Sequence, residues 1–343
     1  MMTIRMNPHG SFATPSIFVV EPQILTFTNA QAVGPAGPTL VQCQTAYASD
    51  ATILASLAVN NGYQSFTIPE TGIYQFSVAG AAGGIWLFSP MSTATAALAP
   101  TLDGYKRLPG ALLVGTYSLT AGQVITMVVG QCGGDDDNDA ANCPGGGGGT
   151  FVTLGTYAQV VARIDTLLFA AGGGAGSGYQ PLDTPVDLYT VGIGQSTTSG
   201  GNSTELGGIN GNGTVTLPTA SNSAGGGGYL TGSGLTTTPD FSYTIPTNSA
   251  AVAFRYGAKG GSFTGLTRGY GGFGCGGPGA NTASSDDDKG GGGGYSGGGY
   301  GFDANAQGGG GGSYANPSVT GISITAGGNV TSKHGYVLIQ KME

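Results

Sequence analysis

Short segments of alternating hydrophobic and polar residues dominate the first 130 positions. Apolar and polar residues alternate over 64–68 and again over 72–78, on either side of a turn that contains Pro69 and Gly72. This pattern predicts a hairpin with one apolar face. Residues 111–119 and 124–129 predict a second strand pair, in which Gly122 allows a tight turn. Strand pairs at such short spacing predict a β-sandwich.

No convincing helical period runs through residues 13–129, and residues 51–59 fit either a short helix or a buried strand. After residue 130, β-branched and aromatic segments alternate with runs of glycine. They predict strands at 150–154, 167–170, 252–256 and 336–340. We expect the last of these to pair with the opening sheet and to join both halves of the chain without a flexible linker.

The pattern therefore predicts an all-β protein in four parts. Residues 1–24 form an N-terminal arm, and 25–130 supply most of a β-sandwich. Residues 131–330 form a glycine-rich region with intervening strands, and 331–343 return to the sandwich as its closing strand.

Glycine accounts for 69 of the 343 residues, about a fifth where a usual protein has roughly 7%. Runs of three or more occur at 145–149, 172–174, 225–228, 290–294, 297–299 and 308–312. Disorder is disfavoured because 39% of the chain is hydrophobic and only 8% is charged. Collagen is excluded because glycine does not recur at every third position with abundant proline.

Glycine runs can form polyglycine II helices, which have no internal hydrogen bonds and must bond to neighbouring segments. Only glycine allows the axes of neighbouring polyglycine helices to approach so closely. We expect a packed bundle of such helices, flanked by aromatic side chains, although flexible loops on a β-domain remain the alternative. The expected structural residues are Gly147, Gly226, Gly292, Gly298 and Gly310, with Phe151, Tyr229, Tyr295, Tyr300 and Tyr314 as apolar plugs.

The net charge is −8, with ten Lys and Arg in the whole chain. Phosphate binding needs clustered cations, so we expect neither nucleic acid nor an anionic membrane as a partner. The segment RGYGGFG, which begins at Arg268, is similar to arginine/glycine-rich RNA binders but holds a single Arg. No stretch approaches the roughly 20 apolar residues of a membrane span, and the start does not read as a signal peptide. We therefore expect synthesis in the cytoplasm.

Four cysteines are too few for a disulfide scaffold. Cys132 and Cys143 bracket an acidic loop and could join in a disulfide, or both could be thiols in a reducing compartment. Within that loop, Asp135, Asp137 and Asp139 are weak candidates for a calcium site, because their spacing fits no calcium-loop pattern. A solvated loop is the favoured interpretation.

Only His9 and His334 are present, which leaves little for acid–base chemistry. The glycine runs contain G-x-G-x-x-G by chance, but no predicted helix follows and no P-loop motif occurs. We expect no enzymatic activity, no metal and no cofactor.

Several segments occur in the same order as in one known family. They include GPAGPTLVQCQTAY at 34–47, FTIPETGIYQFSVAGAAGG at 66–84, LFAAGGG at 168–174, LGGINGN at 206–212 and GGFGC at 271–275. Over residues 25–341 the chain resembles the extracellular glycine-rich region of the anaplastic lymphoma kinase and leukocyte tyrosine kinase receptors. The resemblance implies a tumour-necrosis-factor-like sandwich, or jelly roll, with an inserted bundle of polyglycine helices.

In those receptors the region binds small protein ligands. The present sequence has no kinase signature of the VAIK, HRD or DFG type. The resemblance therefore implies a scaffold and not receptor signalling, and no ligand-contact residue can be carried over.

Two functions fit these observations. The first is a non-enzymatic structural protein of an exposed assembly, such as a virion surface or capsid-associated protein. It would self-associate, for instance as a trimer, and contact other particle proteins. The second is a recognition or adhesion module for a host surface protein or glycan. Ice binding is a weaker third alternative.

Overall fold

The computed structural model describes residues 23–85, 107–135, 142–177, 186–214, 224–234, 250–262, 269–282, 286–301 and 307–343. The expected N-terminal arm before residue 23 lies outside these ranges, as do Asp137, Asp139 and Arg268.

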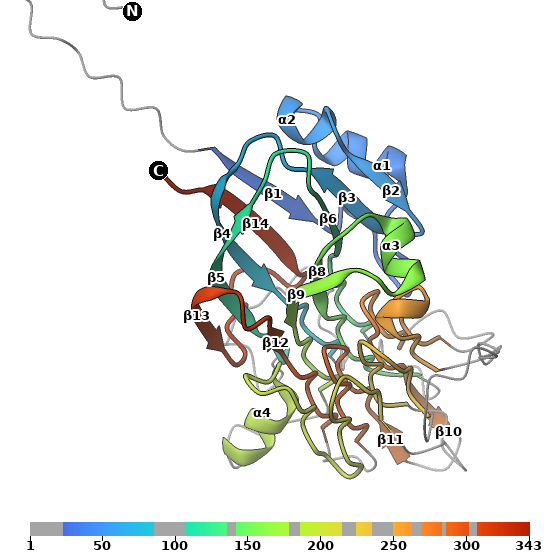
Figure 1. Cartoon of the computed structure of the whole chain (residues 1–343). Coiled ribbons are helices and arrows are strands. Elements are labelled where there is room, and N and C mark those ends of the chain that lie inside the picture. The colour runs from blue at the N-terminus through green and yellow to red at the C-terminus, as the bar shows by residue number, and fades with distance from the viewer. Residues whose placement is uncertain are drawn as a thin grey trace, which may run out of the picture.

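The described chain is mostly β and forms two antiparallel sheets that pack face to face, which confirms the predicted all-β sandwich (Figure 1). The five-stranded sheet has the order β1 (Ile24–Thr28), β14 (Tyr336–Lys341), β4 (Gly72–Ala79), β5 (Leu112–Leu119), β13 (Thr320–Thr325). The six-stranded sheet has the order β12 (Tyr314–Ala315), β9 (Thr166–Ala171), β8 (Thr150–Leu154), β6 (Val124–Val128), β3 (Tyr63–Thr67), β2 (Ala58–Asn60). A small third sheet has the order β11 (Asp286–Asp288), β10 (Gly279–Thr282), β7 (Asn142–Cys143).

The sandwich core comes from the inward-facing half of the alternating pattern. Phe76 of β4 is fully buried and packs against Phe169 of β9, with ring centroids 5.3 Å apart. Phe27 of β1 packs edge-on against Phe66 of β3 at 5.5 Å. Each pair joins one strand of the five-stranded sheet to one of the six-stranded sheet, so the core holds the two sheets together.

The two predicted hairpins are wrong in their pairing, although their strands lie close to where the sequence places them. β3 pairs with β2 and β6, whereas β4 pairs with β14 and β5. β5 and β6 likewise belong to different sheets. At both Pro69–Gly72 and Thr120–Gln123 the chain crosses from one sheet to the other. A period of two shows which side chains face a core, but it does not identify the partner strand.

The helices are short and were mostly missed from the sequence. α1 (Leu40–Ala46) and α3 (Tyr157–Ala162) each begin with a capping box, formed by Thr39 with Gln42 and by Thr156 with Gln159. Of the two alternatives for residues 51–59, the short helix is present as α2 (Ala51–Leu54), and the strand that follows it, β2, is an exposed edge strand and not a buried one. The strand predicted at 252–256 is wrong, because a 3₁₀ helix, η1 (Phe254–Tyr256), occupies it. The remaining helix is α4 (Val186–Gly192).

The final strand β14 lies between β1 and β4, so the end of the chain pairs with its opening sheet. The glycine-rich region also supplies sandwich strands, since β8, β9, β12 and β13 all fall within residues 131–330.

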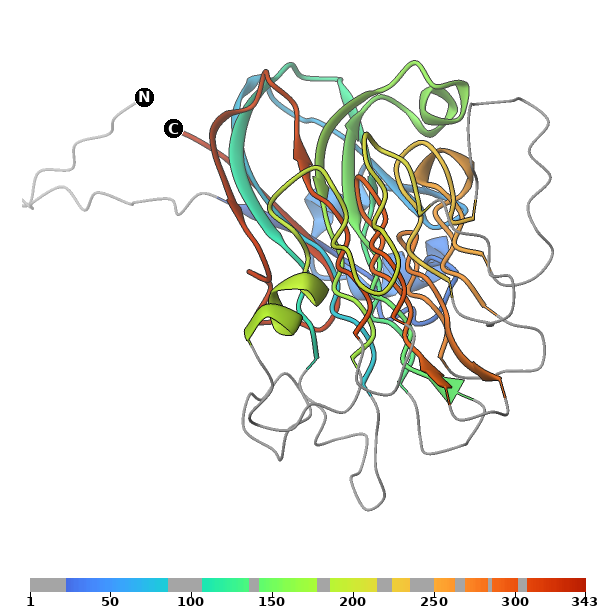
Figure 2. The same cartoon turned by 90° about the horizontal axis from the view of Figure 1, so that it is seen from below.

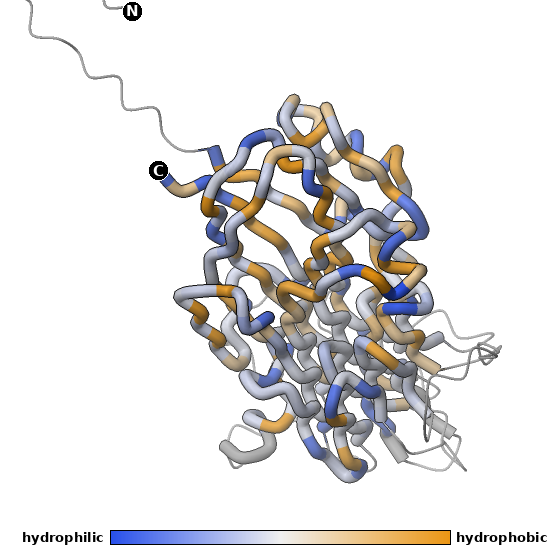
Figure 3. The backbone as a smooth tube through the Cα atoms, in the orientation of Figure 1, coloured by the Kyte–Doolittle hydropathy of each residue, from blue (hydrophilic) through white to orange (hydrophobic). Residues whose placement is uncertain are grey.

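Glycine segments continue directly from the sandwich strands at one end (Figures 1 and 2). β4 runs into residues 80–84, β6 into 129–134 and β9 into 172–177, while residues 145–149 lead into β8 and 307–313 into β12. In Figure 3 this part of the tube is pale, whereas the sandwich strands carry the hydrophobic residues. The sandwich thus fixes where the glycine segments start.

Hydrogen bonds from the run 290–294 repeat with a period of three residues. The amides of Gly290 and Gly293 donate to residues 144 and 147, and those of Gly291 and Gly294 donate to residues 224 and 227. The amides of Gly292 and Tyr295 donate to residues 309 and 312. Three successive amides therefore point in three directions, unlike the two directions of a β-ladder. The run 145–149 repeats in the same way, because its amides alternate among segments 131–134, 274–277 and residue 174.

The carbonyls of run 290–294 accept hydrogen bonds from three further segments. Gly290 and Gly293 accept from residues 176 and 173, Gly291 accepts from residue 277, and Gly292 accepts from residue 298. Segment 290–294 is thus surrounded by hydrogen-bonded neighbours on all sides. We call this arrangement of hydrogen-bonded glycine segments, centred on 290–294, the glycine lattice.

Candidate functional site

The glycines singled out in the sequence all lie in the glycine lattice, where a side chain would meet backbone. A Cβ atom would lie 2.4 Å from the Ala82 carbonyl oxygen at Gly147 and 2.2 Å from that of Gly173 at Gly292. At Gly226, Gly298 and Gly310 the nearest carbonyl oxygen would be only 1.8–1.9 Å away. Real Cβ contacts are essentially never shorter than 3.0 Å, so even alanine would have to displace backbone at these positions.

The structure brings four of the five predicted aromatic plugs into one cluster beside the lattice. Phe151 and Tyr229 both pack against Phe254, at 4.7 Å and 5.3 Å between ring centroids. Tyr295 stacks on Tyr229 at 6.3 Å and on Tyr314 at 4.7 Å. Tyr300 is also buried, but it lies outside this cluster. Sequence reasoning missed Phe254, whose residues 252–256 it had assigned to a strand.

The proposed disulfide between Cys132 and Cys143 is not present, and both residues are buried thiols. The Cys132 Sγ atom lies 3.2 Å from Nη1 of Arg107, and Cys143 is part of β7, which pairs with β10. The alternative of two thiols describes the structure.

Asp135, the described member of the weak calcium candidate, is engaged by a cation of the protein. Both of its carboxylate oxygens accept hydrogen bonds of 2.6 Å from Arg107, and Oδ1 also accepts from the amide of Ile85. The Arg107 side chain is only 3% exposed. Asp135 therefore compensates a buried charge, and the described residues contain no group of His, Cys, Asp and Glu placed to hold a metal ion.

His334 also has a structural role. Its Nδ1 atom accepts a hydrogen bond of 3.1 Å from the amide of Cys132, which requires that nitrogen to be unprotonated. Burial, reinforced by Lys333 and Arg107, lowers the pKa of His334 to about 4. The ring is consequently neutral at pH 7.

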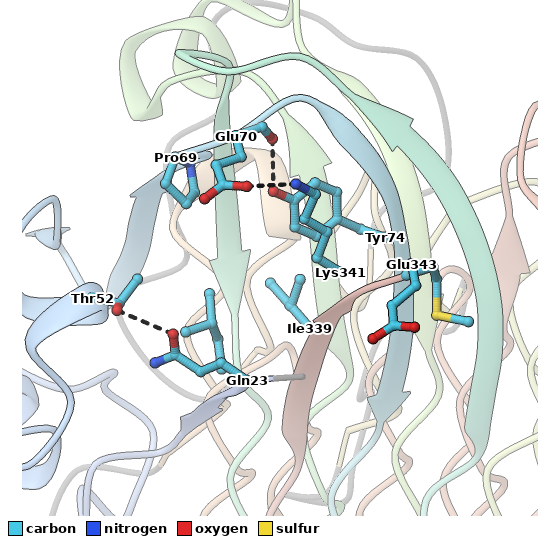
Figure 4. Close-up of a pocket in the computed structure, with 10 residues that line it drawn as sticks. Gln23, Thr52, Pro69, Glu70, Tyr74, Ile339, Lys341 and Glu343 are labelled. Carbon is cyan, nitrogen blue, oxygen red and sulfur yellow. Dashed lines mark hydrogen bonds and ion pairs between the residues drawn. The ribbon is translucent and has the colours of Figure 1, made fainter. Parts of the chain in front are cut away.

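One pocket lies at the end of the sandwich near both described termini, with a volume of about 550 Å³ (Figure 4). Lys341 donates to the Glu70 carboxylate at 2.5 Å, and the Tyr74 hydroxyl donates to the Glu70 carbonyl at 2.7 Å. Thr52 donates to the Gln23 side chain at 3.3 Å across the opposite wall. The Glu70 side chain is 68% exposed, so this polar rim is open to solvent.

A second pocket, of about 410 Å³, lies where the β2–β3 turn, α3 and the segment after η1 meet. We call it the cationic pocket. Arg163, Arg255 and Lys259 line it together with Tyr63, Tyr157 and Tyr256. None of its ten lining residues carries a carboxylate. Three of the ten Lys and Arg residues in the chain thus converge on one cavity.

Aromatic rings and one buried acid hold the two arginines of the cationic pocket. The Arg163 guanidinium lies 4.8 Å from the Tyr256 ring centroid and donates to its hydroxyl. The Arg255 guanidinium lies 4.5 Å from the Tyr229 ring centroid, donates to its hydroxyl, and is 3.5 Å from the Asp165 carboxylate. Both contacts fall within cation–π distance, so the positions of the charges are defined before any ligand arrives.

Backbone strain is concentrated around the same pocket. Asn61, Arg163 and Ala258 all have left-handed φ angles, of 50°, 62° and 52°. Asn61 and Arg163 line the pocket, and Ala258 lies between two residues that do. Such conformations cost roughly 1–3 kcal/mol each and cluster at binding sites. Sequence reasoning missed this pocket because its cations are 102 or more residues from Asn61 in the sequence, and neither charge pattern nor spacing connects them.

No family model matches the chain. Over 153 residues, or 41% of this chain, it is 29% identical to the leukocyte tyrosine kinase receptor of Mus musculus. The match spans 15% of the receptor's length. This level of identity indicates a distant relation to that receptor family. No helix within the described ranges is long and apolar enough to cross a membrane.

Proposed function

We propose that the protein is a non-enzymatic structural component of an exposed assembly, located at a virion surface or associated with a capsid. The single observation that carries this proposal is the glycine lattice, in which one central segment is hydrogen-bonded on all sides. Such a core serves rigidity and leaves few side chains in its interior for chemistry.

We further infer that the glycine segments are polyglycine II helices and that the sandwich is a tumour-necrosis-factor-like jelly roll. The hydrogen-bond period of three in runs 145–149 and 290–294 supports the first inference, because polyproline II helices have three residues per turn. The crossing of the chain between sheets at two successive turns supports the second.

A lattice of this kind suits a protein that must persist outside a cell. Local opening exposes a segment to proteases only when its hydrogen bonds break together. Opening residues 290–294 would break bonds to six other segments at once. We therefore expect the described lattice to resist proteolysis under native conditions.

Self-association, for instance as a trimer, is part of the same proposal, and the outward face of the five-stranded sheet is the surface we propose for it. Thr26, Leu338, Ser77, Val114 and Ser323 stand in register across its five strands and are at least partly exposed. The row is uncharged. In a chain of net charge −8, an uncharged face lets copies meet without direct repulsion.

Locating the native chain tests the proposal. Virions purified from the natural source by density gradient, and treated with protease before lysis, should contain the intact protein in stoichiometric amounts. Native mass spectrometry of the isolated protein should show an oligomer. A monomer that is absent from purified particles would refute the structural role.

Recognition of a host-surface molecule is a second candidate, and the cationic pocket favours it. The distant relation to a protein named as a receptor adds support for a binding role. Both roles are compatible in a particle protein that also attaches to cells.

A further inference from the structure

We propose that the cationic pocket binds the acidic group of an anionic saccharide, either a carboxylate or a sulfate. The proposal deepens the recognition role above and is independent of whether the protein belongs to a particle. Its basis is the meeting of Arg163, Arg255 and Lys259 with tyrosine rings in one cavity of saccharide-binding size.

The local charge of the pocket is opposite to that of the molecule. The net charge of the chain is −8, whereas three cations line this cavity and one buried carboxylate, Asp165, lies behind Arg255. Among the described residues at the pocket, cations therefore outnumber carboxylates. The Asp165 side chain is fully buried, so it holds Arg255 in place without facing a ligand. A field confined to a cavity attracts a small anionic group, whereas the net negative charge of the chain disfavours a long polyanion.

The remaining lining suits a sugar ring. Tyr157 is only partly buried and is fixed by a hydrogen bond of 2.8 Å from the Asn61 side chain and by an edge contact with Tyr63. Aromatic faces pack against the C–H faces of a ligand while hydroxyl and amide groups bind its polar edges. The cavity of about 410 Å³ is near the lower end of the range for small-molecule pockets, which fits one or two sugar units.

Lys259 and Arg163 are the residues we assign to the acidic group. The Lys259 side chain is exposed at the rim, and its backbone is held by a hydrogen bond from the Val252 amide. Arg163 ends α3 in a left-handed conformation that favours glycine, yet it carries a guanidinium stacked on Tyr256. An arginine at a position where glycine would be less strained points to a role for its charge.

Binding is measured by isothermal titration and saturation-transfer NMR on the full chain. The probes are 3′-sialyllactose against lactose, which tests a carboxylate, and lactose 3′-sulfate against lactose, which tests a sulfate. We expect one acidic probe of either pair to bind, its neutral partner not to bind, and affinity to fall as salt rises from 50 to 500 mM. The two pairs distinguish a carboxylate from a sulfate as the recognised group.

Two variants and one control assign the binding to this pocket. Lys259→Gln and Arg163→Gly should each weaken binding by roughly tenfold to a hundredfold, since each removes a charge-assisted hydrogen bond. Arg163→Gly should retain the wild-type melting temperature, because glycine adopts the left-handed conformation freely. Lys341→Gln removes the same charge at a distant site, next to Glu70, and should bind like the wild type.

Three outcomes overturn the proposal. The first is equal binding of acidic and neutral sugars. The second is an equal loss of binding affinity in Lys341→Gln and Lys259→Gln. The third is binding of a tyrosine-sulfated peptide but of no saccharide. None of these outcomes bears on the presence of the chain in particles, so a failure here is distinct from a failure of the structural role.

Discussion

Two adjacent glycines, Gly226 and Gly227, should respond oppositely to alanine. At Gly226 the new Cβ would lie 1.9 Å from the Gly292 carbonyl oxygen, about 1.5 Å short of the 3.4 Å at which ordinary contact begins. At Gly227 the nearest atom would be the Cβ of Cys275, at 3.2 Å. The two glycines lie next to each other in one run, so backbone propensity and local composition predict the same effect for both substitutions.

Relief of the clash at Gly226 requires one segment to move by about 1.5 Å. The bonds from the Gly226 amide to Gly298 (2.8 Å) and from the Gly298 amide to Gly292 (2.9 Å) would then exceed hydrogen-bonding distance. Each buried group left unpaired costs about 1–3 kcal/mol. We therefore expect Gly226→Ala to lose about 3 kcal/mol or more of folding free energy, which lowers the melting temperature of this 343-residue chain by roughly 4 °C or more.

Gly227→Ala should change the melting temperature by no more than about 2 °C, because Cys275 needs to move by only about 0.2 Å to reach ordinary contact and alanine reduces the entropy of the unfolded chain. Differential scanning calorimetry on both variants and the wild type measures the difference. Equal melting temperatures for the two variants, or a wild-type value for Gly226→Ala, would show that the glycine segments are loosely packed loops.

Three further predictions concern ionisable groups. The pKa of His334 is about 4 in the folded state and near 6.5 in the unfolded state. As pH drops from 6.5 to 4, the unfolded state binds the proton first, so the free energy of unfolding should fall. Urea titrations should show a loss on the order of 2–3 kcal/mol that is absent in His334→Gln. Asp135→Asn removes the carboxylate that binds the buried Arg107 through two hydrogen bonds and should cost about 3–5 kcal/mol in the same assay. Glu70→Gln, at the exposed pair with Lys341, should melt with the wild type. The four buried thiols should not react with Ellman's reagent in the native state and should all react in guanidinium; rapid reaction of native protein would contradict their burial.

The sequence was informative about strands and uninformative about their partners. Alternation correctly placed β4, which buries one face against the core, whereas β-branched and aromatic residues identified β8 and β14. It paired β3 with β4 wrongly, since a turn that crosses between sheets uses the same Pro and Gly residues as a hairpin turn. α1 and α3 are too short for a hydrophobic period, although their capping boxes are present in the sequence.

The sequence likewise predicted one candidate site, the glycine lattice, and missed another, the cationic pocket. The glycine runs identified the lattice positions because glycine is needed where backbones touch, and that need is local in sequence. The cationic pocket could not be found, because it joins Asn61, Arg163 and Arg255 from separate parts of the chain. The ion pair of Arg107 with Asp135 was hidden for the same reason, and the sequence favoured a solvated acidic loop with a weak calcium candidate as the alternative.

The period of three in the glycine lattice also constrains how this protein can change in length. Each amide of residues 290–294 reaches its partner only in the correct rotational phase, and one residue corresponds to about 120° around the axis. Insertion or deletion of one or two glycines would turn every later amide in that segment toward the wrong neighbour, whereas a change of three restores the phase. Homologous chains should therefore differ in the length of these runs by multiples of three residues.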